Sequence, residues 1–498
     1  MKKLFRRQAA SVILAGACLS AANAAPWVSP DDIHLRADIQ MLADAGIITV
    51  PVNTFPLMWS GIIQDLEKAS ISSEQEAIRL AIHRVRHAFT QQNDKRGVTK
   101  FSAGAATNTA RFQHFGSPLR EKGEASISHE GMGNRVAYKV KATYAYHSQD
   151  DEDVRLDGSY FSIVLGNWAF TGGVIDQWWG PGWDTALTMS TNARPIPTMM
   201  VSRNQAEAFD LPVLEWLGPW TLSTGVGWLN DDDRHVEDAL LWTFRATIKP
   251  LPQLELGVSR SAQLCGDDRD CGLSTWGDML AGDDNAVGSE GSTEEQPGNQ
   301  LAAIDFRWGD TAWGIPYGIY GETMGEDNFS PSKFPPFSAK SYLGGVDVTY
   351  HIGKQQIRTF FEYTDTGAEC GSGYNCAYEH HLYQSGYRYW KRSIGSTYDN
   401  DAKTYTLGFV GTRLNGHQWK TNLRYLDLNF DNSNKNAPGG NTVAPIAEQA
   451  KQIDVSYLLP FFNGRLELGM DYTHSSFDNA GEDSDGRWNG WAKYEFVF

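Results

Sequence analysis

The sequence lacks long apolar runs beyond its first residues. No stretch of about 18 or more apolar residues follows the N-terminal segment, which excludes transmembrane helices from the rest of the chain. Cations are also scarce, since 43 Lys and Arg stand against 60 Asp and Glu and leave a net charge of −17. A nucleic-acid backbone is bound by clustered cations, so nucleic acid is not an expected partner.

Catalytic motifs are absent as well. The chain has no G-x-S-x-G, no H-E-x-x-H and no phosphate-binding loop. No histidine stands at zinc-site spacing from a cysteine, and the pair His380-His381 has no third ligand at helical or strand spacing. We therefore expect no enzyme, no cofactor and no bound metal. A hydrolase that uses scattered Asp, His and Ser side chains is the minor alternative.

Cysteine is rare, with five residues in 498. Cys18 falls in the N-terminal segment, and the other four form two C-x5-C pairs, Cys265 with Cys271 and Cys370 with Cys376. In an oxidising compartment this spacing predicts two local disulfides. Each one would pin a loop and add little global stability, because the closed ring is short.

The N-terminus predicts export. Four basic residues among the first seven precede an apolar run, Ala9–Ala21, and a small-x-small pattern at Ala22–Ala24. We expect residues 1–24 to be a cleaved signal peptide. Its removal leaves 39 Lys and Arg against 60 Asp and Glu, so the mature protein is more acidic than the full chain.

Instead of long apolar runs, the sequence has segments in which apolar and polar residues alternate with a two-residue period. In "WNGWAKYEFVF", Trp488, Tyr494 and Phe498 share one face, and Lys493 and Glu495 share the other. An apolar-out, polar-in strand that ends in an aromatic residue is typical of the last strand of an outer-membrane barrel. The same alternation recurs in "NRVAYKVKATYAYH" and "GRLELGMDYTH".

Turn signals give the direction of the strands. Asn415-Gly416 and Asn463-Gly464 are two-residue hairpin signals, and a long polar stretch lies between them. Short turns on one side and long loops on the other predict periplasmic turns and external loops. Counting backwards from Phe498 gives about 18 antiparallel strands over residues 98–498, with 198–214, 185–191 and 159–171 among them. The predicted fold class is an all-β transmembrane barrel.

Residues 25–97 have a helical pattern instead. "SPDDIHLRADIQMLADAG" offers Ser29 as a helix cap and Leu35, Ile39 and Leu42 on one stripe. "LMWSGIIQDLEK" and "SEQEAIRLAIHRVRHAF" predict two more helices. All three are too polar to span a bilayer, so we expect a small periplasmic helical domain against the barrel mouth.

Several of these segments occur, in order, in a known family. They are "DDIHLRADIQMLADAGII", "DGSYFSIVLGNWAFTGGVIDQWWGPGWDTALTMSTNARPIPTMMVSR", "ALLWTFRATIKPLPQLELGVSRSAQ", "NQLAAIDFRW", "YGIYGETMGEDN" and "YEHHLYQSGYRYWKRSIGSTYDNDAKTY". Over nearly the whole mature chain the sequence resembles the Wzi capsule-assembly proteins. The resemblance implies an eighteen-stranded outer-membrane barrel with periplasmic helices, which acts as a lectin that holds capsular polysaccharide. The acidic, cysteine-bearing segment 265–298 departs from the family pattern.

The segment "QWWGPGWD" has an unusual density of indole. Gly180-Pro181-Gly182 breaks any regular period, so the rings belong to a shaped loop, which is expected to begin at the periplasmic end and fold into the lumen. The rings could seal the lumen or stack on sugar, and nearby charged groups could bond hydroxyls. The candidate saccharide-binding residues here are Asp176, Trp178, Trp179, Trp183, Asp184 and Arg194.

A second candidate set lies in the expected external loop 366–403. Aromatic rings with interleaved donors suit a carbohydrate, and Arg388, Lys391 and Arg392 could meet uronic-acid carboxylates. An aromatic girdle at the lipid interface is the structural alternative. The candidate residues are Tyr378, His380, His381, Tyr383, Arg388 and Trp390.

Together these features predict an outer-membrane, lectin-like barrel that binds and retains capsular or extracellular polysaccharide. Its other expected partners are outer-membrane lipid and the export machinery of the polysaccharide. A porin for small solutes is the alternative, because eighteen strands can enclose an aqueous channel. The two functions differ in whether the lumen is open or plugged.

Overall fold

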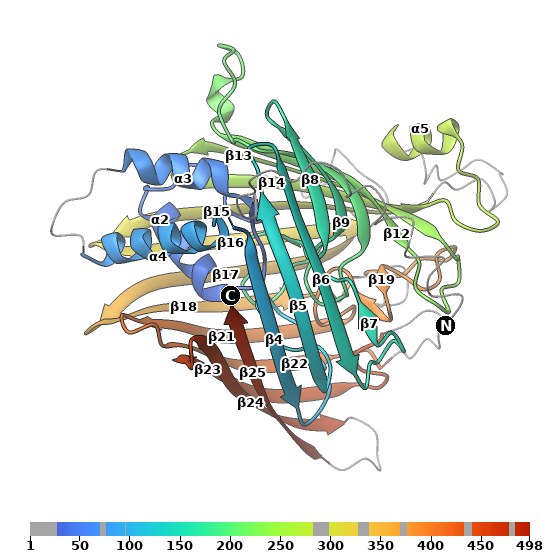
Figure 1. The fold of residues 1–498 in the computed structure, drawn as a ribbon. Helices are drawn as coiled ribbons and strands as arrows, with labels where there is room; N and C mark the ends of the chain where they lie inside the picture. The colour runs from blue at the N-terminus through green and yellow to red at the C-terminus, as the bar shows by residue number, and fades with distance from the viewer. Residues whose placement is uncertain are drawn as a thin grey trace.

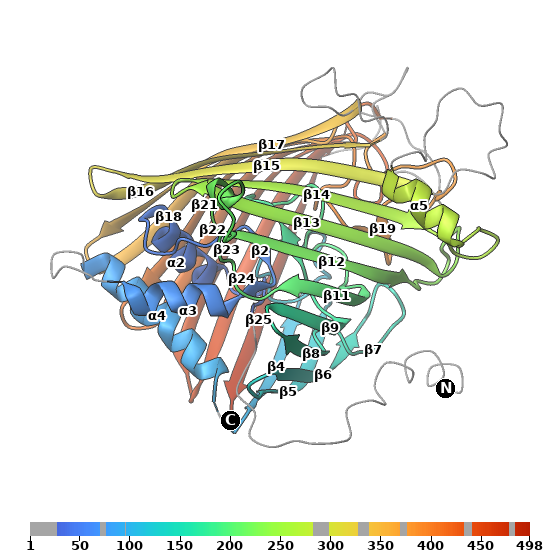
Figure 2. The same cartoon turned by 90° about the horizontal axis from the view of Figure 1, so that it is seen from above.

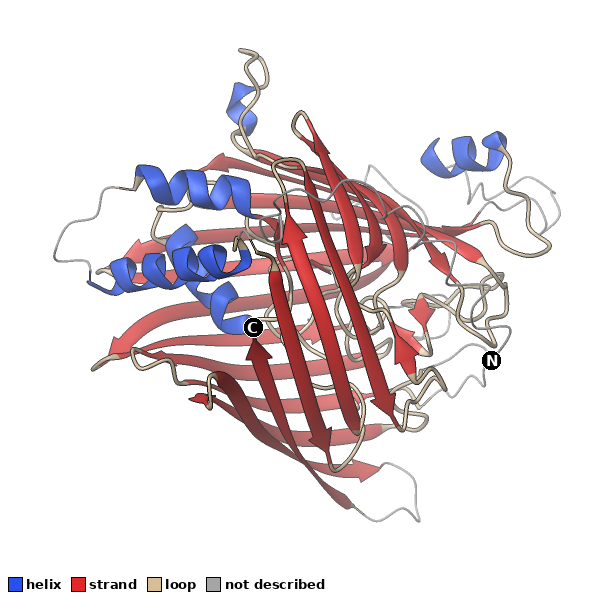
Figure 3. Cartoon of the chain, in the orientation of Figure 1, coloured by secondary structure: helices blue, strands red, loops and turns tan. Residues whose placement is uncertain are grey.

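The computed structural model describes residues 27–69, 76–94, 96–281, 298–326, 338–368, 376–432, 441–477 and 484–498. The predicted signal peptide, residues 1–24, lies outside the described residues. Strands form the wall of a barrel, and the helices α2 (Ile33–Asp44), α3 (Trp59–Lys68) and α4 (Glu76–Gln92) gather at the end where the chain terminates (Figure 1, Figure 3). No helix among the described residues is long and apolar enough to cross a bilayer.

The wall is a closed ring of eighteen antiparallel strands within the described residues, as predicted. The ring closes between the last strand and the first, with Phe496 opposite Phe101. A two-residue strand, β7 (Val154–Arg155), pairs with β6 beyond the end of β8 and extends that position of the wall. The eighteen strands are β4 (Val98–Ala106), β5 (Gly123–Met132), β6 (Val136–Tyr146), β8 (Tyr160–Leu165), β9 (Trp168–Val174), β11 (Pro197–Arg203), β12 (Trp220–Leu229), β13 (Ala239–Leu251), β14 (Leu254–Leu264), β15 (Gly298–Ala312), β16 (Ile315–Glu326), β17 (Ser338–Ile352), β18 (Gln355–Asp365), β21 (Ala402–Arg413), β22 (Gln418–Leu428), β23 (Glu448–Phe461), β24 (Gly464–Phe477) and β25 (Asp485–Val497).

The two-residue period sorts the side chains between the two faces of the wall. Outward positions carry exposed apolar residues, such as Val140 and Tyr144 on β6 and Met470 on β24. Inward positions carry buried charged residues, such as Arg245 on β13 and Arg358 on β18. An apolar exterior around a polar interior is the pattern of a barrel that stands in lipid.

Two errors in the predicted strands cancel in the count. Residues 185–191 are not a strand, and the predicted strand 159–171 is the hairpin of β8 and β9. Its turn lies at Gly166, where φ is +59°. The extra hairpin reverses the direction of the chain, so the loop after β9 leaves the wall at the end that carries the long loops. The prediction that this loop begins at the end of the short turns is therefore wrong. The predicted strand 198–214 also stops early, because β11 ends at Arg203.

The two ends of the barrel differ in their connections. One end has short turns, such as Phe462-Asn463 between β23 and β24, where φ is +41° and +59°. This turn lies one residue before the predicted Asn463-Gly464. The other end carries long segments, including residues 107–122 and 366–401. We call these the turn end and the loop end of the barrel.

Three helices lie at the turn end: α2 (Ile33–Asp44), α3 (Trp59–Lys68) and α4 (Glu76–Gln92) (Figure 2). The cap of α2 is Asp32 and not Ser29 as predicted. Its Oδ1 accepts hydrogen bonds from the backbone N–H groups of His34 and Leu35 at 2.9 and 3.0 Å. Nearly every residue of α2 is buried, because this helix enters the barrel and contacts β15, β16 and β21.

Candidate functional site

Two segments far apart in the chain meet inside the barrel. The strand β10 (Trp178–Trp179) pairs with β2 (Thr54–Phe55), so the tryptophan-rich loop and the N-terminal segment form one small sheet. The backbone N–H of Gly180 donates to the carbonyl of Asn53 at 3.0 Å and extends the pairing. We call residues 27–58 together with residues 175–196 the lumen plug.

The three tryptophans form the core of the lumen plug. Trp178, Trp179 and Trp183 are 0%, 1% and 1% exposed. Trp183 stacks on Phe360 of the wall with ring centroids 5.8 Å apart, and its Nε1 donates to Asp347 Oδ2 at 3.0 Å. Trp178 Nε1 donates to the carbonyl of Gly182 at 3.1 Å. No indole face is open to a ligand in this conformation, which favours the sealing role over the sugar-stacking role.

The glycines of "GPG" are required by this packing. Gly180 has a φ of +115°, a conformation that L side chains rarely adopt. A Cβ at Gly182 would lie 2.1 Å from the carbonyl oxygen of Thr185. The backbone of the loop therefore makes a tight turn with no side chain at Gly180 or Gly182, and the indole rings fill the space around it.

An arginine of α2 joins the helix to the tryptophan-rich loop. Arg36 Nη2 donates to the carbonyls of Gly182 at 2.7 Å and Pro181 at 3.2 Å. Its guanidinium carbon lies 4.3 Å from the ring centroid of Trp183 and 4.6 Å from that of Phe115. A desolvated cation over aromatic faces adds to these hydrogen bonds, so the two halves of the lumen plug are held together.

Carboxylates of the wall hold the backbone of the lumen plug. Glu362 on β18 accepts hydrogen bonds from the backbone N–H groups of Trp183, Asp184 and Thr185 at 2.6, 3.1 and 3.1 Å. Glu255 on β14 accepts from Val52 and Asn53 at 2.9 and 3.0 Å. An irregular segment inside a barrel buries peptide groups that need partners, and a carboxylate is a strong acceptor. Neither glutamate could be predicted from the sequence, because its only signal there is an inward position on a strand.

Four charges fasten α2 to the wall. Arg307 of β15 and Arg358 of β18 each contact both Asp44, the last residue of α2, and Asp347 of β17. The four nitrogen–oxygen distances lie between 2.5 and 2.9 Å, and all four side chains are nearly inaccessible to solvent. Each side chain thus pairs with two of opposite charge, and such pairing offsets the cost of burying ions.

Asp184 is engaged within the protein. Arg424 Nη2 lies 2.8 Å from Asp184 Oδ1, and the hydroxyls of Thr406 and Tyr398 donate to Oδ2. Burial favours the neutral acid, but the Arg424 guanidinium outweighs it and holds the pKa of Asp184 below its ordinary value. Asp184 thus binds the tryptophan-rich loop to β21 and β22.

Part of the loop-end segment 376–401 folds onto the lumen plug. Tyr378 and Tyr383 are buried, and their hydroxyls donate to the carbonyls of Leu187 and Cys265 at 2.7 and 3.1 Å. Arg388 is buried against Asp399, to which Nε and Nη2 each donate at 2.8 Å. These three predicted saccharide contacts are occupied by intramolecular bonds in this conformation.

The other predicted residues of segment 376–401 keep some accessible surface. His381 is exposed, and His380 and Trp390 are half-buried. The rings of His380 and His381 lie 4.6 Å apart. The guanidinium carbon of Arg194 lies 5.4 Å from the ring centroid of Trp390, which places an aromatic face beside a charged donor. No three His, Cys, Asp or Glu side chains converge as metal ligands in the part of the chain that the structure describes.

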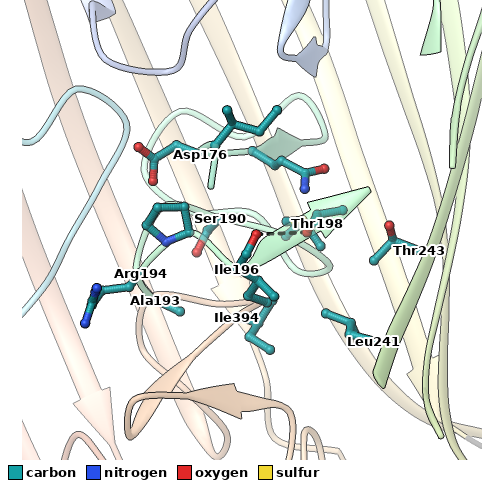
Figure 4. Close-up of a pocket in the computed structure, with 13 residues that line it drawn as sticks. Asp176, Ser190, Ala193, Arg194, Ile196, Thr198, Leu241, Thr243 and Ile394 are labelled. Carbon is teal, nitrogen blue, oxygen red and sulfur yellow. Dashed lines mark hydrogen bonds between the residues drawn. The ribbon is translucent and has the colours of Figure 1, made fainter. Parts of the chain in front are cut away.

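Asp176 and Arg194 line the same small cavity at the edge of the lumen plug (Figure 4). Its volume of about 20 Å³ is room for roughly one water molecule. Burial raises the pKa of Asp176 to about 6. Arg194 is fixed by Asp157 and Asp150 at 2.9 and 2.8 Å. The cavity is too small for a sugar ring.

The first predicted disulfide, Cys265–Cys271, is present. Cys370 lies outside the described residues, so its pairing with Cys376 stays a prediction. Cys265 begins the acidic segment 265–298, which contains α5 (Leu273–Ala281) at the loop end.

Peptide mapping under non-reducing conditions tests both pairs. We expect one linked peptide from Cys265 and Cys271, another from Cys370 and Cys376, and none that joins the two loops, because each pair is close in sequence. Free thiols at these positions, or a peptide that crosslinks the loops, would contradict the assignment.

Comparison with known proteins agrees with the fold. Residues 92–487 match the family described as capsule assembly protein Wzi. A relative from Klebsiella pneumoniae, described as an uncharacterized 55.8 kDa protein in the cps region, is 28% identical over 339 residues. That alignment covers 68% of this chain and 64% of the relative, slightly less than two thirds of its length.

A solved structure matches this chain over its own full length. It is Wzi of Escherichia coli, described as an outer membrane protein involved in group 1 capsule assembly and as a carbohydrate-binding β-barrel. The two chains are 23% identical with a TM-score of 0.79, and the match covers 96% of this chain and 100% of that one. At this level of identity the likeness establishes the shared fold.

Proposed function

Because the chain belongs to the family of Wzi capsule assembly proteins, we propose that it is a lectin-like barrel of the outer membrane, which binds capsular or extracellular polysaccharide and retains it at the cell surface. Residues 1–24 are the signal peptide in this proposal. Residues 25–97 face the periplasm, where the export machinery of the polymer is a further partner. The surrounding lipid contacts the apolar exterior of the wall.

The observation that carries the proposal is the filled lumen. A porin needs an aqueous path between the two ends of its barrel. Here buried tryptophans, α2 and the loop-end segment occupy the interior, and wall carboxylates bond their backbone. A barrel filled in this way acts through its surfaces, and the predicted contacts His380, His381 and Trp390 keep accessible surface at its loop end.

The predicted contacts that keep accessible surface are Asp176, His380, His381 and Trp390, which we call the outer-face residues. Sugar rings stack on aromatic faces, and their hydroxyls bond charged side chains. Each such contact is weak, so a long polymer is held by repetition of its units over many copies of the barrel. This arrangement supports retention of a polymer better than capture of a small solute.

Removal of two outer-face rings tests the proposal. A double variant, His381→Ala with Trp390→Ala, should release polymer into the medium while synthesis and export continue. Loss of one stacking contact costs about 0.5–1.5 kcal/mol, and repetition multiplies this loss along the polymer. The measurement is the ratio of polymer in the supernatant to polymer in the cell pellet after gentle centrifugation.

A matched control lies at the opposite end of the barrel. Trp313, in the turn between β15 and β16, is 99% exposed, so Trp313→Ala removes an indole from the turn end. We expect this variant to retain polymer as the unmodified protein does. Heat-modifiable migration on gels confirms that each barrel has folded. Polymer that stays cell-bound in the double variant, with normal barrel levels, would reject the outer-face residues as the binding site.

A further inference from the structure

The connection between β11 and β12 is unlike the other links at the turn end. Residues 204–219 form a long projection that includes the short helix η2 (Glu215–Leu217). Its apolar side chains point into solvent, since Leu211, Val213 and Trp216 are 56%, 79% and 65% exposed. By contrast, β17 and β18 are joined by Gly353 and Lys354 alone.

The projection stands beside the barrel wall. Figure 1 shows it rising away from the strands near β13, and Figure 2 shows it over the strands and not beyond the helices of the turn end. The two views agree that it extends sideways from the barrel. A sideways projection from a membrane barrel enters the space that lipid occupies.

The base of the projection is fixed to the wall. Phe209 stacks on Trp220 with ring centroids 4.5 Å apart. The guanidinium carbon of Arg203 lies 3.6 Å from the centroid of the same Trp220 ring. Lys249 on β13 donates its backbone N–H to Pro219 at 2.9 Å. Gly218 has a φ of +66°, and a Cβ there would lie 2.0 Å from the carbonyl oxygen of Lys249. The exposed apolar side chains are therefore held away from the wall by a rigid base.

The amino-acid composition of residues 204–219 indicates what binds this apolar surface. Residues 204–219 contain no Lys or Arg and three acids, Glu207, Asp210 and Glu215. The acidic side chains disfavour insertion into the hydrocarbon centre of a bilayer and are repelled by anionic headgroups. Tryptophan, by contrast, favours the headgroup boundary. Exposed apolar side chains also lie on the outer face of the adjoining strands, Phe170 on β9 and Met199 on β11, and β11 leads into the projection. A zwitterionic phospholipid leaflet fits both the apolar and the acidic groups.

We propose that residues 204–219 are a membrane foot, which inserts Leu211, Val213 and Trp216 at the headgroup boundary of the periplasmic leaflet. The foot fixes the depth and rotation of the barrel in the membrane, because its base contacts β11, β12 and β13. This role depends on the turn end being periplasmic and is independent of saccharide binding.

A fluorescent label at the tip tests the membrane foot. Val213→Cys, labelled with an environment-sensitive nitrobenzoxadiazole group, is reconstituted in vesicles of zwitterionic phosphatidylcholine with iodide on both sides. The matched control is Lys354→Cys, an exposed position in a short turn at the same end. We expect emission from the Val213 label at shorter wavelength and a several-fold lower iodide quenching constant than that of the control.

Two outcomes would overturn the membrane foot. Equal quenching at Val213 and Lys354 would place the tip in water. Protection that arises in native outer membranes but not in pure lipid vesicles would assign the surface to a protein partner. Leu211→Cys repeats the measurement at a second exposed position, and heat-modifiable migration verifies that each labelled barrel has folded.

Discussion

Replacement of Asp347 by Ala should lower the free energy of unfolding by about 3–5 kcal/mol, because it leaves two buried cations with a single carboxylate between them. Arg307 and Arg358 both contact this carboxylate, and the Trp183 indole donates to it. Asp44 would remain as the one carboxylate between two guanidinium groups. The loss would affect the wall and α2 together.

Thermal unfolding in detergent measures this effect, with tryptophan fluorescence and heat-modifiable migration as readouts. The control is Asp233→Ala, which removes an ion pair with Lys391 whose side chains are 82% and 77% exposed. Exposed pairs contribute about 0–1 kcal/mol, so the control should unfold close to the unmodified barrel. An Asp347→Ala barrel that unfolds at the same temperature as Asp233→Ala would contradict the structural role of the four-charge cluster.

The double variant Trp178→Ala with Trp179→Ala should open the barrel to ions. Each buried ring is replaced by a methyl group, and truncation of a buried tryptophan costs about 3–5 kcal/mol. The pairing of β10 with β2 remains, but the core of the lumen plug loses its largest side chains. We expect a steady conductance in planar bilayers from the variant and none from the unmodified protein.

The same variant separates sealing from sugar binding. The outer-face residues are unchanged in it, so polymer should stay attached to the cell although the barrel conducts. Trp313→Ala, an indole removed from the turn end, should neither conduct nor release polymer. Release of polymer without conductance would instead assign saccharide contact to Trp178 and Trp179.

The barrel could be predicted from the sequence because its period is local. Alternation of apolar and polar residues reports which face of each strand meets lipid, and β6 and β25 display it over most of their length. Boundaries failed where the alternation was interrupted. The hairpin of β8 and β9 reads as one strand, because "YFSIVLGNWAFTGGV" has few polar residues and its turn is short.

The contents of the lumen could not be predicted in the same way. The sequence reveals the unusual aromatic loop but does not distinguish a plug from a binding surface, since that depends on segments far away in the chain. Glu362 illustrates the difficulty. An inward-facing carboxylate is common on the strands of a barrel with a polar interior. Only the structure shows that this carboxylate accepts a hydrogen bond from the backbone N–H of Trp183. The accessible residues were likewise indistinguishable from buried ones such as Tyr383 and Arg388.

The contacts of α2 have a consequence for the order in which this protein folds. Asp44 is separated by 263 residues from Arg307 and by 314 from Arg358, so these contacts close very long loops of chain. Such contacts form late, because the entropy of loop closure must be overcome before they contribute. The N-terminal helix is synthesised first and yet reaches its position only after β15, β17 and β18 have been placed. We therefore expect the wall to form before its filling, so that the newly closed barrel passes ions until its N-terminal segment enters the lumen.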